Sequence, residues 1–276
     1  MSNIIEIKNL TKKYDHFQAV NDISFTLDKG SIVGFVGKNG AGKSTTIRCL
    51  MNMIFPTSGT CTIDGLDCIT NAKQIRHIVG YMPSDSLFHN NILVKDLFKF
   101  CTSFSEIKMD KAIELSNYFE LDIDKKIGEL SLGNRKKVSI IQLLLKESTI
   151  LILDEPTSGL DPLMQDKFFE LLLKEKEKGT TIFLSSHNLN EIERYCDRTL
   201  IIKDGHIIDD IDMKKAIIKR PQIVTYTTKD GKDSSTEFNG DINELIKTLS
   251  ALELSSLEIK TKSVEDEFIK YYKEDN

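Results

Sequence analysis

The sequence lacks the cysteine pattern, the leader and the long apolar runs that mark secreted, zinc-bound or membrane-spanning chains. Its five cysteines include no CxxC pair, so neither a disulfide framework nor a zinc cluster is indicated, and a reducing cytosol fits. The first residues contain no apolar stretch typical of a signal peptide. The longest apolar runs, such as 140–145, are far shorter than the roughly 20 residues of a transmembrane helix. If the protein acts at a membrane, we expect another chain to provide the span.

Positive charge is also scarce. Lysine and arginine number 37 against 42 acidic residues, for a formal net charge of −5, whereas proteins that bind nucleic acid mainly through its phosphates are usually basic. Only six of the basic residues are arginine, the side chain best suited to bidentate base and phosphate contacts. In other respects the composition is that of a globular protein: the 276 residues are 40% hydrophobic, enough for a sizeable core.

Hydrophobic periodicity predicts strands that alternate with helices. Ile5 and Ile7, and later Ile23 and Phe25, alternate with polar residues at the period of a half-buried strand, and 32–36 reads as a strand buried on both faces. The remaining expected elements follow in chain order: helix 43–54, mostly helical structure over 92–146, strand 149–153, helix 166–178, strand 181–184, helix 189–195 and strand 199–203. This alternation indicates an α/β fold with a largely parallel sheet.

The character of the sequence changes after about residue 220. The expected elements there are strand 223–227, a turn at Lys229-Asp230-Gly231-Lys232, strand 235–238, an amphipathic stretch at 242–249, a strand near 257–260 and a short final helix. We therefore expect two domains, 1–220 and 221–276, of which the second is a small α+β appendage.

Residues 37–45 match the phosphate-loop pattern GxxxxGK[ST] in full, between an expected buried strand and an expected helix. Glycines let backbone N–H groups point inward at phosphate oxygens, and the helix N-terminus adds partial positive charge. Lys43 is expected to reach the β- and γ-phosphates, and Ser44 to ligate Mg²⁺. The whole loop is expected to bind nucleotide: Gly37, Lys38, Asn39, Gly40, Ala41, Gly42, Lys43, Ser44 and Thr45.

Two acids follow the expected buried strand 150–153. The strand would place Asp154 beside the phosphate loop, where a carboxylate can hold Mg²⁺ directly or through water. Glu155 would then be positioned to polarise an attacking water. An apolar run followed by two acids is common by itself, but the complete phosphate loop upstream favours the catalytic interpretation.

Further motifs occur in a fixed order. Leu130-Ser131-Leu132-Gly133-Asn134 places Ser131 23 residues before Asp154, residues 156–162 follow Glu155, and His187 stands 32 residues after Glu155. With Tyr14 near the N-terminus, these motifs resemble the ATP-binding cassette (ABC) ATPases over about residues 3–215. In that family they correspond to the signature, the D-loop, the switch histidine and the aromatic that stacks on adenine.

The resemblance implies the fold of an ABC nucleotide-binding domain for 1–220: a P-loop NTPase with a parallel core sheet, an antiparallel β subdomain and a helical subdomain at about 88–146. It implies ATP and Mg²⁺ as cofactors, and two cassettes packed head to tail, either a homodimer or a pair of paralogues. It also implies an integral membrane permease as partner, no nucleic acid, and a place in the cytoplasm on the inner face of the cell membrane.

The resemblance also assigns roles to side chains. The catalytic residues would be Glu155, His187 and Lys43, and the metal ligands Ser44 and Asp154. Nucleotide would be bound by Tyr14, the phosphate loop and, across the dimer interface, Ser131 and Gly133, while Asp161 would link the two sites.

Two departures from the family pattern stand out. Leu132 and Asn134 replace residues of the family's LSGGQ signature, although Ser131 and Gly133 are kept. After a strand and a loop proline the family has Gln, or often Glu in its export branch, whereas this chain has Ser84. The Ser84 hydroxyl is too short to reach Mg²⁺ or the lytic water as Gln would. Asp85 is next and could substitute.

Other segments have two interpretations. The apolar segment 87–97 is either core or, by the resemblance, part of the groove that receives a transporter's cytoplasmic helix. Residues 135–137 are expected to be a solvated helix start and not a nucleic-acid patch. His16, His77, His89 and His206 have no supporting motif and are expected to be structural.

We expect the ATPase subunit of an exporter, because 263–268 resembles the ending of bacterial bacitracin, lantibiotic and multidrug export cassettes. Maltose-type importers carry a longer regulatory domain than 221–276 allows. The alternatives are a soluble ABC ATPase in translation or DNA repair, and an ATP-dependent regulator. Translation-type members resemble two cassettes in one chain, and repair members separate the phosphate loop from the two acids by long coiled coils.

Overall fold

The computed structural model describes residues 3–85, 87–104, 107–213, 215 and 221–261. The chain divides into two compact units, Met1–Ile211 and Asp212–Asn276, and each is described by itself. The first unit holds the phosphate loop and the other motifs from Tyr14 to His187. The domain boundary expected at 220/221 adjoins residues 216–220, which lie outside the described residues.

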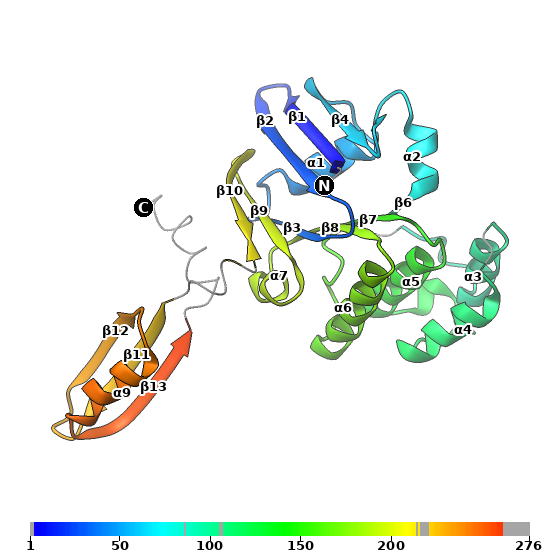
Figure 1. Cartoon of the computed structure of the whole chain (residues 1–276). Coiled ribbons are helices and arrows are strands. Elements are labelled where there is room, and N and C mark those ends of the chain that lie inside the picture. The colour runs from blue at the N-terminus through cyan, green and yellow to red at the C-terminus, as the bar shows by residue number, and fades with distance from the viewer. Residues whose placement is uncertain (1–2, 86, 105–106, 214, 216–220, 262–276) are drawn as a thin grey trace. The chain divides into compact units, whose positions relative to one another are not determined.

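A six-stranded sheet forms the centre of the first unit, in the order β10-β9-β3-β8-β7-β6 (Figure 1). The strands are β3 (Ile32–Val36), β6 (Val79–Met82), β7 (Ile150–Asp154), β8 (Thr181–Ser186), β9 (Arg198–Lys203) and β10 (His206–Asp212). β3 pairs in parallel with β8 and β9, and β7 with β6 and β8. Every residue of β3, β7 and β8 is buried, as expected for parallel strands covered on both faces. The expected α/β class is confirmed.

An antiparallel sheet packs beside it, in the order β2-β1-β4-β5. Its strands are β1 (Asn3–Tyr14), β2 (Phe17–Asp28), β4 (Ser58–Ile63) and β5 (Leu66–Asp67). One hydrophobic core is shared by the two sheets and α1 (Lys43–Leu50). Phe25 of β2 contacts Phe35 of β3 and Phe183 of β8, with ring centroids 5.4–5.9 Å apart within this trio.

The helical subdomain consists of α3 (Val94–Thr102), α4 (Met109–Tyr118) and α5 (Leu132–Leu144), which lie together on one side of the unit (Figure 1). The other helices of the unit are α2 (Ala72–Ile78), η1 (Ile127–Glu129), α6 (Pro162–Glu177) and α7 (Leu189–Tyr195). In the described part of the chain, no helix is both long enough and apolar enough to cross a membrane.

Helix ends differ from the sequence prediction for local reasons. α1 ends at Leu50 instead of near 54, because Asn52 has a left-handed backbone with φ of 50°. α6 begins four residues earlier than expected: the Asp161 carboxylate caps it by accepting from Met164 N at 3.0 Å, and Pro162 is its first residue.

The second unit contains β11 (Gln222–Thr228), β12 (Asp233–Phe238), α9 (Ile242–Ser250) and β13 (Leu254–Thr261). The strands form an antiparallel sheet in the order β12-β11-β13, so the expected hairpin and strand are present. Val224, Leu245 and Leu249 form a small core of their own. The expected final helix and the motif at 263–268 lie outside the described residues.

Candidate ATP-binding and hydrolysis site

The phosphate loop connects β3 to α1 and surrounds a cavity of about 270 Å³. The cavity is lined by Tyr14, Phe17, Ala19, the loop residues 38–45 and Glu155. Gly42 has φ of 111°, and a Cβ there would lie 2.6 Å from the carbonyl oxygen of Ala19. Glycine is therefore required at Gly42 by its backbone conformation and by the available space.

Lys43 is buried at the base of this cavity, with 5% of its surface exposed. Its ammonium donates to the carbonyl oxygens of Gly37 at 2.6 Å and Lys38 at 3.3 Å. It also lies 3.3 Å from Glu155 Oε1. Because the backbone already orients this cation toward the loop, it is placed to contact phosphate oxygens of a bound nucleotide.

The two expected metal ligands are in contact. The Ser44 hydroxyl donates to Asp154 Oδ1 at 3.0 Å, and the Ser185 hydroxyl donates to the same oxygen at 2.6 Å. Asp154 Oδ2 is buried and has no hydrogen-bond partner in the described part of the chain. An unpartnered carboxylate oxygen beside a hydroxyl fits Mg²⁺, which prefers oxygen ligands and takes the rest from water and phosphate.

Glu155 directly follows β7 and contacts the expected switch histidine. Its Oε2 lies 2.7 Å from His187 Nδ1. Its backbone is left-handed, with φ of 49°, and its N–H donates to the Ser185 hydroxyl at 2.9 Å. Such a conformation in a non-glycine residue is uncommon and requires support from its surroundings. Here it turns the carboxylate into the cavity above the phosphate loop.

The signature residues lie apart from this cavity. Ser131 caps α5, its hydroxyl accepting from Asn134 N at 3.3 Å. A Cβ on Gly133 would lie 2.8 Å from the carbonyl oxygen of Gly159. The described residues that line the cavity do not include Ser131, Gly133 or Asp161. One copy of the chain thus brings together the phosphate loop, Asp154, Glu155 and His187, but not the signature.

Two aromatic residues border the nucleotide cavity. Tyr14 and Phe17 are paired across the β1–β2 hairpin, and are 43% and 62% exposed. Lys12 Nζ lies 4.8 Å from the Tyr14 ring centroid, within range of a cation–π contact. Sequence reasoning identified Tyr14 but missed Phe17, although an aromatic pair around a two-residue turn was a usable signal.

The basic segment 135–137 was expected to be solvated, and this prediction is wrong for two of its residues. Lys136 and Lys137 are 5% and 9% exposed. Lys136 Nζ donates to the carbonyl oxygen of Ser84 at 3.0 Å. Burial lowers the pKa of Lys136, while the charges of Asp154, Asp85 and Glu155 act in the opposite direction. A cation of the signature helix therefore reaches the segment where the family has its Gln.

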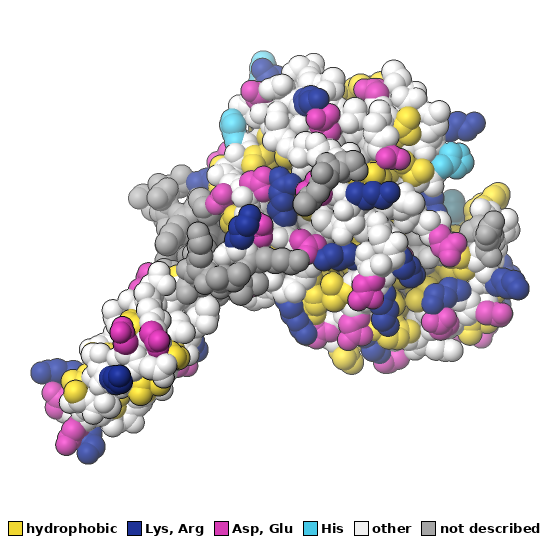
Figure 2. All heavy atoms as spheres, in the orientation of Figure 1, with side chains coloured by type: hydrophobic (Ala, Val, Ile, Leu, Met, Phe, Trp, Pro, Cys, Tyr) yellow, Lys and Arg dark blue, Asp and Glu magenta, His cyan; other side chains and the backbone are white. Residues whose placement is uncertain are grey.

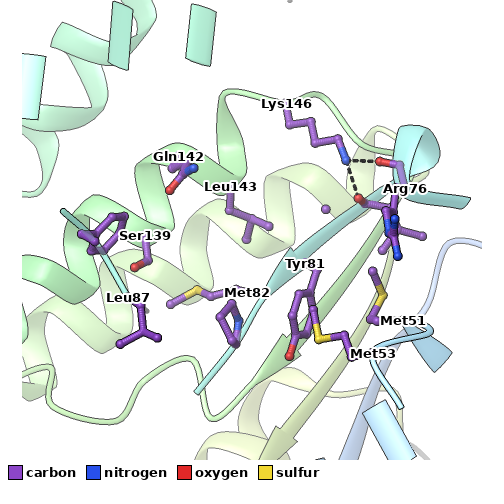
Figure 3. Close-up of a pocket in the computed structure, with 14 residues that line it drawn as sticks. Met51, Met53, Arg76, Tyr81, Met82, Leu87, Ser139, Gln142, Leu143 and Lys146 are labelled. Carbon is purple, nitrogen blue, oxygen red and sulfur yellow. Dashed lines mark hydrogen bonds between the residues drawn. The ribbon is translucent and has the colours of Figure 1, made fainter. Parts of the chain in front are cut away.

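A second cavity, of about 450 Å³, lies between β6 and the C-terminal half of α5 (Figure 3). Its apolar lining includes Met51, Met53, Tyr81, Met82 and Leu87. Figure 3 shows these side chains around one common space. This cavity is called the methionine groove below.

The apolar segment 87–97 contributes to both the core and the methionine groove. Val94 is fully buried, whereas Leu87 is 97% exposed and lines the groove. At the rim, Lys146 Nζ donates to the carbonyl oxygens of Arg76 and Val79. Burial lowers the pKa of Lys146.

Comparisons with known proteins agree with this geometry. The sequence model of a family described as ABC transporter matches residues 20–158. The bacitracin transport ATP-binding protein BcrA of Enterococcus faecalis is 32% identical over 237 positions, covering 84% of this chain and 77% of BcrA. YhcH, an uncharacterised ABC transporter ATP-binding protein of Bacillus subtilis, is 31% identical, covering 98% of this chain and 96% of YhcH. A solved ATP-binding subunit of an ABC transporter has a TM-score of 0.70 at 28% identity, covering 77% of this chain and 91% of that one.

Proposed function

Because the chain belongs to the ABC transporter family, as an ATP-binding subunit with ATPase activity, we propose that it drives export through a separate membrane protein by ATP-dependent closure of a cassette pair. This proposal is supported by the finding that one chain places only part of the expected site residues around the cavity. The cavity holds the phosphate loop and Glu155, whereas Ser131 and Gly133 lie outside it. A second cassette would supply these signature groups.

In the proposed hydrolysis, Glu155 orients a water and takes up its proton as the water oxygen attacks the γ-phosphorus. The bond between the γ-phosphorus and the bridging oxygen breaks, giving ADP and inorganic phosphate. Lys43 neutralises charge on the phosphate oxygens, and His187 binds the γ-phosphate. The Glu155–His187 contact of 2.7 Å supports a shared function for the two side chains.

Other residues would hold the nucleotide. Ser44 and Asp154 would bind Mg²⁺, which shields the phosphate charges when bound. Tyr14 would stack on adenine. From the opposite cassette, the Ser131 hydroxyl and the Gly133 N–H would contact the γ-phosphate, and Asp161 would link the two sites. Since the γ-phosphate is then part of the interface, ATP favours the closed pair and hydrolysis favours opening.

The methionine groove is the proposed binding site for the membrane partner. Methionine side chains adapt to different apolar surfaces, as a groove for an amphipathic helix requires. Met53 and Leu87 are 54% and 97% exposed there, large exposures for apolar side chains beside a cavity. Through this partner the chain would lie on the inner face of the cell membrane.

The proposed cargo is a peptide antibiotic or a related drug, since the name of the relative BcrA refers to bacitracin transport. A nucleic-acid partner is not supported. On the face that Figure 2 shows, Lys and Arg are interspersed with Asp and Glu, and no continuous basic surface is seen.

The test is affinity purification of the tagged chain from detergent-solubilised membranes of the source cell, with mass spectrometry of the proteins recovered. We expect a stoichiometric membrane-spanning protein. Its recovery should fall with Met53→Asp or Leu87→Asp, and persist with the matched control Leu252→Asp, an exposed leucine of the second unit. Recovery from the soluble fraction alone, or with ribosomes or DNA, would contradict the export function.

A further inference from the structure

A buried carboxylate, Glu191, accepts hydrogen bonds from residues that neighbour Glu155 and His187 in the sequence. Glu191 is in the first turn of α7, four residues after His187, and only 7% of its surface is exposed. Burial raises the pKa of Glu191, and its hydrogen bonds lower it in part. A carboxylate buried in this way requires hydrogen-bond donors around it.

Its donors come from two different loops. Glu191 Oε2 accepts from the Thr157 hydroxyl at 2.9 Å and from the Ser186 hydroxyl at 3.3 Å. Glu191 Oε1 accepts from the Asn188 amide at 3.1 Å. The Ser186 hydroxyl in turn accepts from the Asn188 backbone N–H at 2.9 Å. One carboxylate thus joins the loop after β7 to the loop after β8.

These two loops carry Glu155 and His187, whose side chains are in contact at 2.7 Å. Thr157 is two residues after Glu155, and Ser186 is one residue before His187. The left-handed backbone of Glu155 is sparsely populated and must be held by its surroundings. The Ser185 hydroxyl holds its N–H from one side, and the Thr157–Glu191 bond fixes the chain immediately after it.

We propose that Glu191 is a positioning residue for ATP hydrolysis. By hydrogen bonding to both loops, it holds Glu155 and His187 in their positions relative to each other. This inference rests on the proposed catalytic roles of Glu155 and His187. Glu191 would not touch the nucleotide. Loss of the Glu191 carboxylate would shift the Glu155 and His187 side chains by less than the 2.7 Å that separates them. The phosphate loop would stay intact.

The experiment measures steady-state ATPase activity of the full chain with Glu191→Ala, Glu191→Gln and the control Glu193→Gln, a partly exposed acid of the same helix. We expect kcat to fall about 10- to 100-fold in Glu191→Ala, because small misplacements cost rates of this order. The KM and the affinity for a non-hydrolysable ATP analogue should stay within about twofold. Glu191→Gln should recover part of the rate, since its amide can still bond Asn188 and Thr157.

Thr157→Val provides a second and gentler test, because it removes one hydroxyl at similar volume. We expect kcat to fall several-fold, on the order of one lost hydrogen bond, and the double variant Glu191→Gln/Thr157→Val to be no slower than the slower single variant. This test remains informative if Glu191→Ala does not fold.

Glu155→Gln is measured in parallel to separate two kinds of failure. If Glu155→Gln keeps near-normal turnover, the catalytic assignment itself is wrong. If Glu155→Gln is inactive while folded Glu191→Ala and Thr157→Val keep wild-type kcat, only the positioning role is overturned. A rise in the dissociation constant for the analogue at unchanged kcat would also overturn it.

Discussion

At the scale of single residues, Glu155 is held by contacts at both of its carboxylate oxygens. Its carboxylate lies 3.3 Å from the Lys43 ammonium and 2.7 Å from His187, and only 16% of its side chain is exposed. The Lys43 ammonium at the same time donates to two loop carbonyls. The side chains expected to act in hydrolysis therefore lie close together within one chain, which would limit the reorganisation needed for catalysis.

Ser84→Gln tests the departure at the expected Gln position. Lys136 holds the Ser84 segment through its backbone carbonyl, so a new side chain should not detach it. We expect kcat to rise by about 2- to 10-fold, less than the roughly 10²- to 10⁴-fold of a full general acid or base, because the longer amide would orient the lytic water without taking up its proton. Ser84→Ala is the control and should keep the wild-type rate. An unchanged rate and Mg²⁺ dependence in Ser84→Gln would show that this position has no such function.

The thiols give a pH-dependent prediction. Burial raises the pKa of Cys49 to about 11 and of Cys68 to about 12, and also raises the pKa of Cys61 and Cys196. Only the thiolate reacts with iodoacetamide, so these thiols should stay unreactive at pH 8 and become reactive as the pH rises toward the raised values. Burial raises the pKa of Cys101 as well, but Cys101 is partly exposed whereas the other four are buried, so we expect native labelling at pH 8 to be slow and confined to Cys101, as read by mass spectrometry.

Urea-denatured protein is the control for the labelling experiment and should be modified at all five cysteines. Rapid modification of Cys61 in the native protein at pH 8 would show that the packing of the antiparallel sheet is looser than described.

The sequence was sufficient to predict that residues of separate ordered motifs lie close together, such as Ser44 with Asp154 and Lys43 with Glu155. It was not sufficient to predict that Lys136 and Glu191 are buried and hydrogen-bonded, because their partners lie in loops that are distant in the sequence. Lys136 looks like part of a solvated basic run until the structure places Ser84 beside it. Glu191 looks like any acid in the first turn of a helix, where acids are commonly found.

At the scale of elements, the start of α5 is packed directly against the loop after β7. Gly133 lies in the first turn of α5, and the backbone of Gly159 is its neighbour. The signature and the D-loop therefore contact each other within one chain. A structural change in either segment would therefore reach the other through this direct contact.

Gly133→Ala should weaken this packing. The added Cβ would lie 2.8 Å from a backbone oxygen, a distance that forces a shift of the loop or the helix. We expect the free energy of unfolding to fall by about 1–3 kcal/mol, as for other overpacked sites, and ATPase activity to fall with it. Urea denaturation measures the first effect.

Leu132→Ala is the matched control for stability, since Leu132 lies on the same turn and is 72% exposed. Its free energy of unfolding should stay within about 0.5 kcal/mol of wild type. A Gly133→Ala variant as stable as wild type would show that the loop moves aside freely.

Elements with a clear apolar pattern in the sequence could be predicted, and elements without one could not. The buried strand β7 and the helix α7 were expected nearly at their observed limits. β4 has the sequence SGTCTI and forms by pairing with β1, which is distant in the chain. In α2 only Ile75 is buried, which is too little for an apolar helical face to be visible in the sequence. Pairing partners and tertiary packing, which a local pattern does not contain, determine these elements.

At the scale of the whole molecule, the two units have separate cores. The core of the first unit extends from the antiparallel sheet through α1 to the central sheet. The core of the second consists of Val224, Leu245 and Leu249 with partly buried neighbours. We expect the second unit to be dispensable for nucleotide binding.

Val224→Asp tests this independence. Val224 is fully buried, and an unpaired charge there should unfold the second unit, because burying it costs several kcal/mol. We expect proteolysis to remove the second unit while kcat stays within about twofold of wild type. Val224→Ala, which leaves a smaller defect, is the control. Loss of ATP binding in Val224→Asp would show that the first unit depends on the second.

We propose that two copies of this chain complete one another's ATP site, and that Glu155 is needed for the hydrolysis that opens them. Light scattering of Glu155→Gln with and without Mg-ATP tests it most directly. We predict a monomer without nucleotide and a stable dimer with Mg-ATP, whereas wild type returns to monomer as ATP is consumed. A variant that hydrolyses ATP at near-normal rate, or that binds ATP and stays monomeric, would contradict the account.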